Sequence, residues 1–377
     1  MGKYILAVFH DNKLSSGATK SFLSNIEYMV NTEIKVIAVV PKKKGDLCDY
    51  LKKNNIITYQ MNYGGNVYAF NKNRLFRFKG YIRCMFKSII SYCNTIVLVA
   101  KIKPYNIDAV YVNTSTIYYG AWVAKRIRAR LFWHFREFCL EDQNSLRIWE
   151  RHFVRIANRA ETIFTISNVI DQYYRDKYGF HNTQMTYNDI SDIYSEVPKI
   201  EHKGINILIT GTICEEKGQR YAIDAVHLLR NENVHLFIAG EVNDYAEGLM
   251  KYVRKQNITN VTFCGLVKNM NDLRGKIDIS LVCAKQEAFG RTIIEDMLAK
   301  IIVVGCDRGA VTELVEDRKT GLIYKYGDVQ DIANKIRILL KDEMLRSLLI
   351  DNAANYAERF TVNSTAMKIR GMIYDAD

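Results

Sequence analysis

Short apolar runs alternate with longer amphipathic stretches along most of the chain. Each run has the length and the content of β-branched and aromatic residues that are typical of a buried strand. The expected strands are 4–9, 34–40, 56–60, 109–113, 131–135 and 160–166 in the first half, and 205–210, 234–239, 261–264, 277–283 and 301–304 in the second. The expected helices include 18–30, 47–53, 74–101, 145–159 and the region from Val329 onward. Strands that alternate with helices in this way predict an α/β fold with parallel, doubly wound sheets.

One interval, 179–204, has mixed polar residues and no periodicity, so it is interpreted as a linker. The length of 377 residues is enough for two domains, each with its own hydrophobic core. We therefore expect an N-terminal domain at 1–190 and a C-terminal domain at 200–360. A C-terminal helix at 361–377 is expected to pack back on the N-terminal domain.

The compartment is predicted from the cysteines and the apolar segments. Eight cysteines are scattered without a Cys-x-x-Cys pair, which fits a reducing, cytoplasmic environment. The N-terminus lacks the features of a signal peptide, and the apolar stretch 88–100 is interrupted and too short for a membrane span. The sole Asp-x-Asp, at Asp375 and Asp377, lies at the extreme C-terminus and is not expected to bind a metal.

Positive charge is concentrated in the first half. Residues 1–200 carry 29 Lys+Arg and 16 Asp+Glu, a net of +13, and residues 201–377 carry 24 and 25, a net of −1, which together give the overall +12. Basic and aromatic residues are interleaved over 72–87, at the start of the expected helix 74–101. One interpretation is a helix that lies on an anionic membrane surface, and the other is a helix packed on its own domain with solvated basic residues. No nucleic-acid-binding signature accompanies the charge, so nucleic acid is not an expected partner.

The segment Glu287-Ala-Phe-Gly-Arg-Thr-Ile-Ile-Glu295 follows an expected strand and opens an expected helix at Gly290. A helix N-terminus favours phosphate through its unpaired N–H groups and its dipole. Two carboxylates beside such an anion site suit a ligand with central phosphates and hydroxyl-bearing sugars at both ends, which describes a nucleotide sugar. The alternative is an ordinary strand–loop–helix unit with solvated acidic residues.

Three motifs of the second half, taken together, resemble retaining glycosyltransferases of family GT4. These motifs are Gly211…Lys217-Gly218, Phe237-Ile-Ala-Gly240 and Glu287-x-Phe-Gly290…Glu295, the last being the family's Glu-x7-Glu. In the first half, Trp133-His-Phe-Arg-Glu137 resembles the segment that supplies the family's active-site histidine. The resemblance implies the GT-B fold, in which two Rossmann-like domains face each other across a cleft. Without it, His134 would be interpreted as a buried core residue with satisfied hydrogen bonds, which a lone histidine more often is.

The resemblance also implies roles for individual residues. Glu295 would bind the nucleoside ribose, Glu287 the hydroxyls of the transferred sugar, and Lys217 the leaving diphosphate. His134 would lie between the donor sugar and the acceptor. Further donor-binding residues would be Gly211, Thr212, Phe289, Gly290, Arg291 and Thr292, and residues of the acceptor or interdomain region would be Gly17, Arg136 and Asn188.

Two positions depart from the family pattern. The arginine that often follows the strand-ending glycine is Thr212 here, so one cation for the diphosphate is missing. We hypothesise that Arg291 compensates for it. The usual Gly-x-Pro before the next strand is Lys300-Ile-Ile302, a change that concerns turn geometry more than chemistry.

The expected function is transfer of a sugar, with retention, from a UDP- or GDP-sugar to a saccharide or lipid-diphosphate-linked acceptor in surface polysaccharide assembly. The family mechanism is front-face attack, for which the protein supplies positioning and charge stabilisation. Neither a metal nor another cofactor is expected. The expected location is cytoplasmic, peripheral at the inner face of a membrane. The alternatives are a nucleotide-sugar epimerase or hydrolase and a non-catalytic nucleotide-sugar-binding subunit. A dehydrogenase is disfavoured because Gly-x-Gly-x-x-Gly is missing after the first strand.

Overall fold

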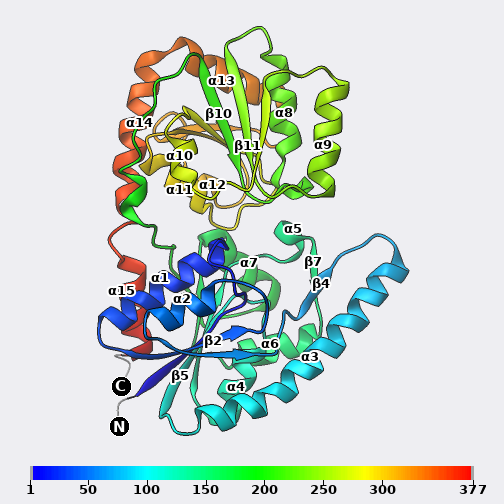
Figure 1. The fold of residues 1–377 in the computed structure, drawn as a ribbon, viewed down its shortest axis with the longest axis vertical. Helices are drawn as coiled ribbons and strands as arrows, with labels where there is room; N and C mark the ends of the chain where they lie inside the picture. Colours follow the sequence, from blue (N-terminus) through cyan, green and yellow to red (C-terminus); the bar gives the residue numbers. More distant parts are fainter. Residues whose placement is uncertain (1–2, 375–377) are drawn as a thin grey trace. The chain divides into compact units, whose positions relative to one another are not determined.

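The computed structural model describes residues 3–374 of the chain. It divides into two compact units, of which the first combines Met1–Asp189 with Asn363–Asp377 and the second is Ile190–Val362 (Figure 1). Each unit is an α/β sandwich around a parallel sheet.

The first unit is built on a seven-stranded sheet in the order β3-β2-β1-β5-β6-β8-β9. All six neighbouring pairs are parallel. The strands are β1 (Tyr4–Val8), β2 (Lys35–Pro41), β3 (Ile57–Met61), β5 (Ile107–Asn113), β6 (Arg130–Phe135), β8 (Thr162–Thr165) and β9 (Thr183–Met185). The order reverses between β1 and β5, and this reversal is the point at which open α/β sheets bind ligands beyond the strand ends.

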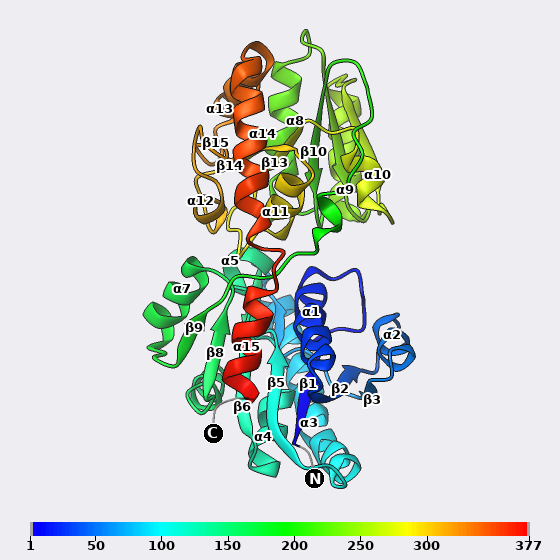
Figure 2. The same cartoon turned by 90° about the vertical axis from the view of Figure 1, so that its left-hand side faces the viewer.

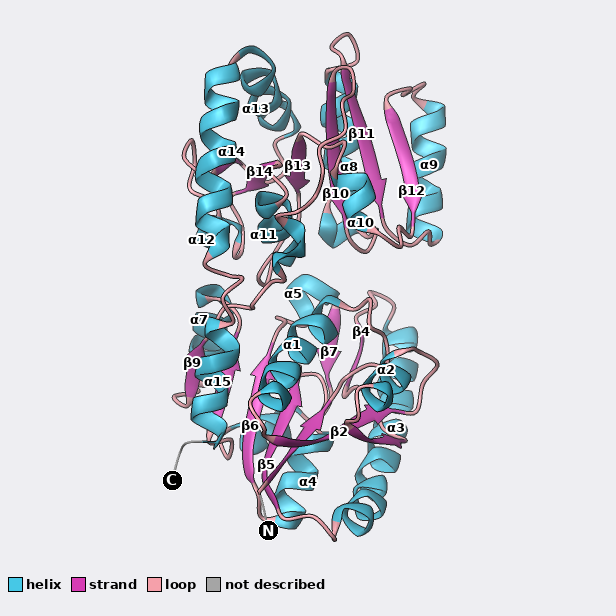
Figure 3. Ribbon diagram, turned by 60° about the vertical axis from the view of Figure 1, so that its left-hand side comes forward, coloured by secondary structure: helices cyan, strands magenta, loops and turns pink. Residues whose placement is uncertain are grey.

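Helices cover both faces of this sheet (Figure 3). They are α1 (Gly17–Asn31), α2 (Leu47–Lys53), α3 (Arg74–Ile102), α4 (Tyr119–Ile127), α5 (Leu140–Gln143), α6 (Glu150–Ala157), α7 (Asn168–Tyr178) and α15 (Ser364–Tyr374). Helix α15 lies beside α1 (Figure 2), and its Ile369 and Ile373 join Phe22 and Ile26 of α1 in one buried cluster. Ser167 caps α7, because its hydroxyl accepts a hydrogen bond from the backbone N–H of Ile170.

The second unit has a six-stranded parallel sheet in the order β12-β11-β10-β13-β14-β15. Its strands are β10 (Ile205–Thr210), β11 (Val234–Ala239), β12 (Val261–Gly265), β13 (Ile279–Val282), β14 (Ile302–Cys306) and β15 (Gly321–Tyr324). Its helices are α8 (Gln219–Leu228), α9 (Asp244–Lys255), α10 (Met270–Arg274), α11 (Arg291–Leu298), α12 (Val311–Leu314), α13 (Val329–Lys341) and α14 (Glu343–Glu358), with short 3₁₀ turns η1 (Asp192–Tyr194) and η2 (Glu215–Lys217). The order reverses between β10 and β13, so the loops after these two strands meet at one edge of the sheet.

Three local predictions were wrong. The expected helix 145–159 begins only at Glu150, because 145–147 form strand β7, which pairs antiparallel with β4 (Val67–Ala69). The interval 179–204 is not wholly irregular, since β9 extends the first sheet next to β8. Strand β15 had no strong apolar signal and was missed. In all three places a pairing with a distant segment decides the local structure, and a window of sequence does not contain that partner.

Helix α3 is one continuous helix whose polarity is reversed relative to an ordinary surface helix. Its buried positions are mostly small or polar, namely Cys84, Ser88, Ser91, Thr95, Leu98 and Ile102. Its exposed positions include Leu75, Phe76, Phe78, Phe86, Ile90, Ile96 and Val97, all between 47% and 72% exposed. Among the helices within residues 3–374, α3 alone is long and apolar enough to cross a membrane by length and composition, a test that core helices of soluble proteins also pass. The sequence analysis judged only the stretch 88–100, which is too short for a membrane span, whereas the whole helix is 29 residues long.

Candidate functional site

Glycine makes the turn before α11 possible. Gly290 has φ +89°, and a Cβ atom there would lie 2.7 Å from Cδ1 of Ile293. An L-residue would therefore be strained by both its backbone conformation and its side chain. The turn starts α11 directly after the loop from β13, as the sequence predicts. The N-terminus of α11, where Arg291 and Thr292 form the first turn, is the anion-favouring end of the helix.

Two further glycines let three loops approach at this edge of the second sheet. A Cβ on Gly218 would lie 2.2 Å from the carbonyl oxygen of Cys283, and one on Gly309 would lie 2.4 Å from that of Glu287. Both glycines have positive φ, +70° and +59°. The loops are joined by hydrogen bonds from the backbone N–H of Lys285 to the Glu216 carbonyl and from that of Ala310 to the Glu287 carbonyl, each 2.8 Å. The backbone of Glu287 is thus fixed from two sides.

Lys217 and Glu287 meet in this arrangement. The Nζ of Lys217 lies 2.7 Å from Oε2 of Glu287, although the two residues are far apart in the sequence. Their side chains are 31% and 16% exposed, so the pair is partly desolvated but still reachable from solvent. A partly desolvated ammonium beside a helix N-terminus is suited to neutralise a phosphate.

The loop after β10 is also held in place. Gly211 has φ +125°. Its carbonyl oxygen lies so close to Gly240 that a Cβ atom on Gly240 would be only 2.1 Å from it. Buried Gln219 donates a hydrogen bond to the Thr212 carbonyl (3.0 Å), and Asn243 donates one to the Ile213 carbonyl (2.9 Å). Thr212 itself is exposed and carries no charge. The position where the family often has arginine is therefore well ordered here but supplies no cation.

Glu295 belongs to a buried cluster that the sequence did not reveal. Arg274, 1% exposed, donates to Glu295 Oε2 and to Asp296 Oδ1, each at 2.7 Å. Ser280 donates to the other oxygen of Asp296 at 2.6 Å. Burial raises the pKa of Asp296, while the charge and hydrogen bonds of Arg274 act in the opposite direction. Arg274 thus fixes the orientation of the Glu295 carboxylate from inside the domain.

Arg291 reaches the same carboxylate from the other side. Its guanidinium lies 3.3 Å from Glu295 Oε1, one helical turn further along α11. The proposed replacement for the missing arginine therefore lies beside Glu295, and it could contact a diphosphate only by dividing its donors between the two. Phe289, one residue before the turn, is buried and packs near Phe360.

In the first unit His134 lies in the core and has no exposed surface. Its Nδ1 is 2.8 Å from the hydroxyl of Tyr111 and 3.1 Å from the guanidinium of Arg136. Because Arg136 can only donate, Nδ1 accepts and the proton of the neutral ring is on Nε2, which is buried without a partner among the described residues. Burial, together with Arg136, holds the pKa of His134 well below its usual value. His134 thus lies in the core of the first unit, and its place between the donor sugar and the acceptor stays a prediction.

Arg136 and Asn188 do come together, at the carboxyl edge of the first sheet. Arg136 donates to Oδ1 of Asn113 (2.7 Å) and to Oδ1 of Asn188. Asn113 in turn donates to the Ala18 carbonyl beside exposed Gly17 (3.1 Å) and to Nδ1 of His10 (3.0 Å). The predicted residues Gly17, Arg136 and Asn188 thus lie around one network.

His10 was missed by the sequence interpretation, although its place two residues after β1 was a usable signal. Burial lowers the pKa of His10 to about 4, with Arg136 acting in the same direction and Asp11 opposing it. The ring is therefore neutral at physiological pH, and its Nε2 lies 3.5 Å from the Ser16 hydroxyl at the start of α1. It is the histidine at this edge that is not fully buried.

Within residues 3–374 no three His, Cys, Asp or Glu side chains lie close enough to hold a metal ion. The Asp375 and Asp377 pair lies outside the described residues.

Comparison with known proteins adds three findings. Residues 191–356 match the family model described as glycosyl transferases group 1. An uncharacterized glycosyltransferase of Methanocaldococcus jannaschii is 24% identical over 43% of this chain and 46% of its own length. A Campylobacter jejuni enzyme named as an α-1,4-N-acetyl-D-galactosaminyltransferase acting on a GalNAc-containing diNAcBac-PP-undecaprenol is 26% identical over 42% of this chain and 44% of its own length. The chain thus spans less than half of the length of each of these curated relatives.

Solved structures agree over the whole length. A glycosyltransferase from Rickettsia africae superposes with a TM-score of 0.80 at 16% identity and covers 100% of both chains. The Anabaena protein HepE, solved in complex with UDP and glucose, gives 0.79 at 20% identity and covers 99% of this chain and 100% of its own. The predicted fold class, two Rossmann-like halves of GT-B type, is confirmed. The family match and the fold together support the GT-B glycosyltransferase superfamily, and the relatives are named as transferases.

Proposed function

We propose that the protein is a retaining glycosyltransferase of GT4 type, which transfers a sugar from a nucleotide-sugar donor to a saccharide or lipid-linked saccharide. The observation that carries the proposal is the Lys217–Glu287 pair, 2.7 Å apart beside the N-terminus of α11. It lies inside the region that matches the glycosyl transferase model.

Each group of this site has a task in the proposed reaction. The diphosphate lies against the first turn of α11 and takes Lys217 as its counter-ion. Glu287, released from Lys217, accepts hydrogen bonds from the hydroxyls of the transferred sugar. Glu295, oriented by Arg274, accepts those of the ribose. The glycosidic C–O bond breaks as the acceptor oxygen attacks the same face, and the leaving phosphate oxygen takes the acceptor proton.

The classes of donor and acceptor are suggested by the relatives. HepE was solved with UDP and glucose, which supports a UDP-sugar as the first donor to test, with GDP-sugars as the second. The name of the Campylobacter relative includes a lipid-diphosphate-linked saccharide, which supports an acceptor of that class in surface polysaccharide assembly. We place the reaction in the cytoplasm, at the inner face of a membrane.

The experiment compares full-length protein with donor alone and with donor plus candidate acceptors, using UDP- and GDP-sugars. Release of nucleotide that depends on acceptor, with a product of retained anomeric configuration, is the expected result. Rapid turnover of donor alone would instead identify an epimerase or hydrolase. Tight donor binding with no turnover under any condition would identify a non-catalytic binding subunit.

We expect the transfer to proceed at full rate in excess EDTA. Lys217 and the α11 N-terminus supply the positive electrostatics that a divalent ion provides in other transferases. The measurement is the initial rate of nucleotide release with and without the chelator. Loss of the rate with EDTA and its recovery with Mn²⁺ would contradict metal independence and leave the other roles intact.

Contact with an anionic membrane is the remaining part of the proposal, and it rests on α3. The helix contains six basic residues and no acidic one, at Arg74, Arg77, Lys79, Arg83, Lys87 and Lys101. Its apolar side chains face outward while its small polar ones face the domain. Exposed apolar side chains flanked by basic ones are the arrangement of a helix that lies in a membrane interface.

Sedimentation with vesicles tests this part. Full-length protein is expected to sediment with phosphatidylglycerol vesicles at low salt and to be released as salt rises. Phe86→Ser with Ile90→Ser should weaken membrane binding at least tenfold. Burial of each large apolar side chain in the interface contributes up to about 1.5–3 kcal/mol to the binding free energy, and the variant loses this contribution. The matched control is Met344→Ser with Leu348→Ser on α14, where two exposed apolar residues are lost from the second unit. Equal binding by both double variants would exclude α3 as the contact.

A further inference from the structure

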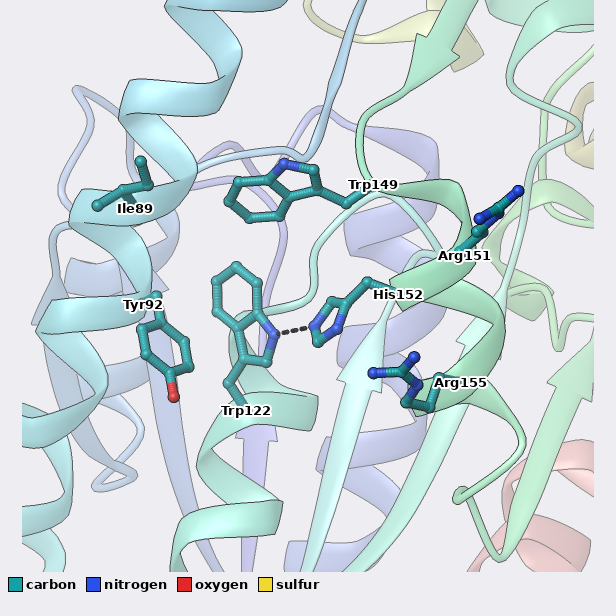
Figure 4. Close-up of a pocket in the computed structure, with 7 residues that line it drawn as sticks. All are labelled: Ile89, Tyr92, Trp122, Trp149, Arg151, His152 and Arg155. Carbon is teal, nitrogen blue, oxygen red and sulfur yellow. Dashed lines mark hydrogen bonds between the residues drawn. The ribbon is translucent and has the colours of Figure 1, made fainter.

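A pocket of about 580 Å³ lies in the first unit between three helices (Figure 4). Its lining comes from α3, α4 and the start of α6, and consists of Ile89, Tyr92, Trp122, Trp149, Arg151, His152 and Arg155. Figure 4 shows the α3 side chains on one side, the α6 arginines on the other, and the two indoles between them. None of these residues belongs to the predicted donor or acceptor sites.

The walls of the pocket are apolar and ordered. Trp122 is 3% exposed and donates its indole N–H to Nε2 of His152 at 2.9 Å. This hydrogen bond satisfies both nitrogen atoms. Burial lowers the pKa of His152, and the nearby arginines and a lysine act in the same direction, so the ring is neutral. Tyr92 packs edge-on against Trp122 at 5.3 Å and is covered by the guanidinium of Arg126 at 4.7 Å. This wall offers contact area to an apolar ligand and few hydrogen bonds.

Trp149 enters the pocket from a costly backbone conformation. It has φ +50° and ψ +47°, in the left-handed region, directly before α6. A bulky residue is rare there because the conformation is strained, and such positions cluster at sites with a functional constraint. The conformation places the indole 6.5 Å, centroid to centroid, from that of Trp122.

The rim of the pocket is positively charged. Arg151 and Arg155 are exposed, and no hydrogen bond or salt bridge of their side chains is found within residues 3–374. Lys125 and Arg159 add further positive charge near His152. Glu150, the adjacent acid, accepts a hydrogen bond from the hydroxyl of Tyr178. Two unpaired guanidinium groups beside an apolar slot are complementary to an anion that carries a hydrocarbon chain.

The pocket is continuous with the exposed apolar surface of α3, because Ile89 and Tyr92 belong to that helix and are 44% and 47% exposed. We propose that the pocket binds one acidic phospholipid, with its phosphate at Arg151 and Arg155 and the first part of an acyl chain between Trp122 and Trp149. The site would anchor the first unit to one lipid molecule in addition to the general membrane contact of α3. It requires no glycosyl transfer, so the proposal stands or falls separately from the proposed reaction.

Tryptophan fluorescence provides a direct test, because two of the three tryptophans line the pocket and Trp133 is fully buried elsewhere in the core. Vesicles of phosphatidylglycerol with acyl chains brominated near the headgroup should quench the emission of the full-length protein, and non-brominated vesicles should not. The variant Trp122→Phe with Trp149→Phe, which retains Trp133 alone, should lose the quenching. Sedimentation without bromine-dependent quenching would show that α3 binds the surface and that the pocket admits no lipid.

A charge-matched pair of variants tests the phosphate contact without changing the core. Arg151→Gln with Arg155→Gln should raise the lipid concentration for half-maximal quenching about thirtyfold, since each of the two basic residues near an anionic surface contributes about 1 kcal/mol. Lys52→Gln with Lys53→Gln on α2 removes the same charge from an exposed helix outside the pocket and should change it much less. Equal shifts in the two variants would overturn a specific phosphate contact.

The source of the phosphate is resolved by soluble probes. Short-chain dihexanoyl phosphatidylglycerol below its micellar concentration should change the tryptophan emission saturably, and Arg151→Gln with Arg155→Gln should weaken the effect. The same response to inorganic phosphate, or to short-chain phosphatidylcholine, would show a site that does not require an acidic lipid and would overturn the proposal. Absence of any saturable response would also overturn it, whether or not the protein sediments with vesicles.

Discussion

Lys217→Ala is expected to lower kcat/KM for sugar transfer by about 10²–10³, the loss typical of removing one group that stabilises charge developing in the transition state. The ammonium stands 2.7 Å from Glu287 beside the N-terminus of α11, and Thr212 supplies no second cation. The loss should fall mainly on kcat, because the charge of the diphosphate oxygen grows as the glycosidic bond breaks. Initial rates at saturating acceptor over a range of donor concentrations provide the measurement.

Lys285→Ala is the matched control for this change. Lys285 is exposed on the loop that carries Glu287, and its backbone N–H holds the loop of Lys217. Removing its side chain takes away the same charge without touching the pair, so activity should change less than threefold, an effect of about 0.6 kcal/mol. Similar losses in the two variants would mean that Lys217 acts through the net charge of the loop.

Glu287→Gln distinguishes catalysis by Lys217 from simple support of its partner. If Lys217 only positions Glu287, its loss should not lower the activity further once Glu287 is replaced. The double variant, Lys217→Ala with Glu287→Gln, would then be as active as Glu287→Gln alone. We expect the double variant to be much less active than Glu287→Gln, because the diphosphate still loses its counter-ion. The same assay measures both.

The meeting of Lys217 and Glu287 could be predicted because both residues lie in loops that follow parallel strands. The carboxyl ends of parallel strands lie at one edge of a sheet, so strand assignment places both loops at that edge, and the observed order with β10 next to β13 brings them together. The glycines at 218 and 290 marked where those loops turn or approach closely, and the structure gives both a positive φ. These signals are local in the sequence, so they can be recognised without knowledge of the tertiary fold.

Arg274 and the orientation of α3 could not be predicted in that way. Arg274 ends a short helix in a polar stretch, and only its contacts with residues on α11 make it a buried ion-pair partner. In α3 the periodicity separates two faces correctly, but burial rules assign the apolar face to the core. The domain packs against the face that carries the serines and the threonine instead, and Ser91 and Thr95 satisfy their hydroxyls on carbonyls of α3 itself.

His134 shows how a correct strand assignment leaves the role of a residue open. The strand position was predicted correctly, and β6 covers Arg130–Phe135. A strand residue points to one face or the other, however, and His134 points into the layer of Tyr111 and Phe164. The role that the family resemblance implies for His134, a place between the donor sugar and the acceptor, stays a prediction.

Arg274→Met is expected to destabilise the second unit by about 3–5 kcal/mol near neutral pH, because it leaves a buried carboxylate without its partner. Asp296 is fully buried and Glu295 is 7% exposed, so neither can recover solvation without local unfolding. The free energy of unfolding of Arg274→Lys should lie between those of wild type and Arg274→Met. The single ammonium group of lysine cannot replace a planar guanidinium that donates to two carboxylates. Urea unfolding followed by circular dichroism provides the free energies.

The destabilisation should depend on pH in a defined direction. Burial already raises the pKa of Asp296 above its unfolded value, and loss of Arg274 removes the charge that opposes this rise. A carboxyl with a raised folded-state pKa stabilises the fold below its unfolded pKa, and this stability is lost as pH rises through the folded pKa. The difference between Arg274→Met and wild type should therefore shrink as pH falls from neutral toward the raised pKa of Asp296, because the variant takes up a proton on this carboxylate. A difference that grew on acidification would contradict the buried ion pair.

A second substitution separates stability from ligand binding. Asp296→Asn in the Arg274→Met background removes the buried charge and should recover part of the lost stability. Nucleotide affinity should stay about tenfold weaker than wild type, because Glu295 still lacks the charge-assisted bond that orients it. Calorimetric titration with UDP at a temperature where every variant is folded measures this affinity. Full recovery of both properties together would show that Arg274 serves the fold alone, whereas recovery of stability without affinity would identify it as the residue that positions Glu295 for the ribose.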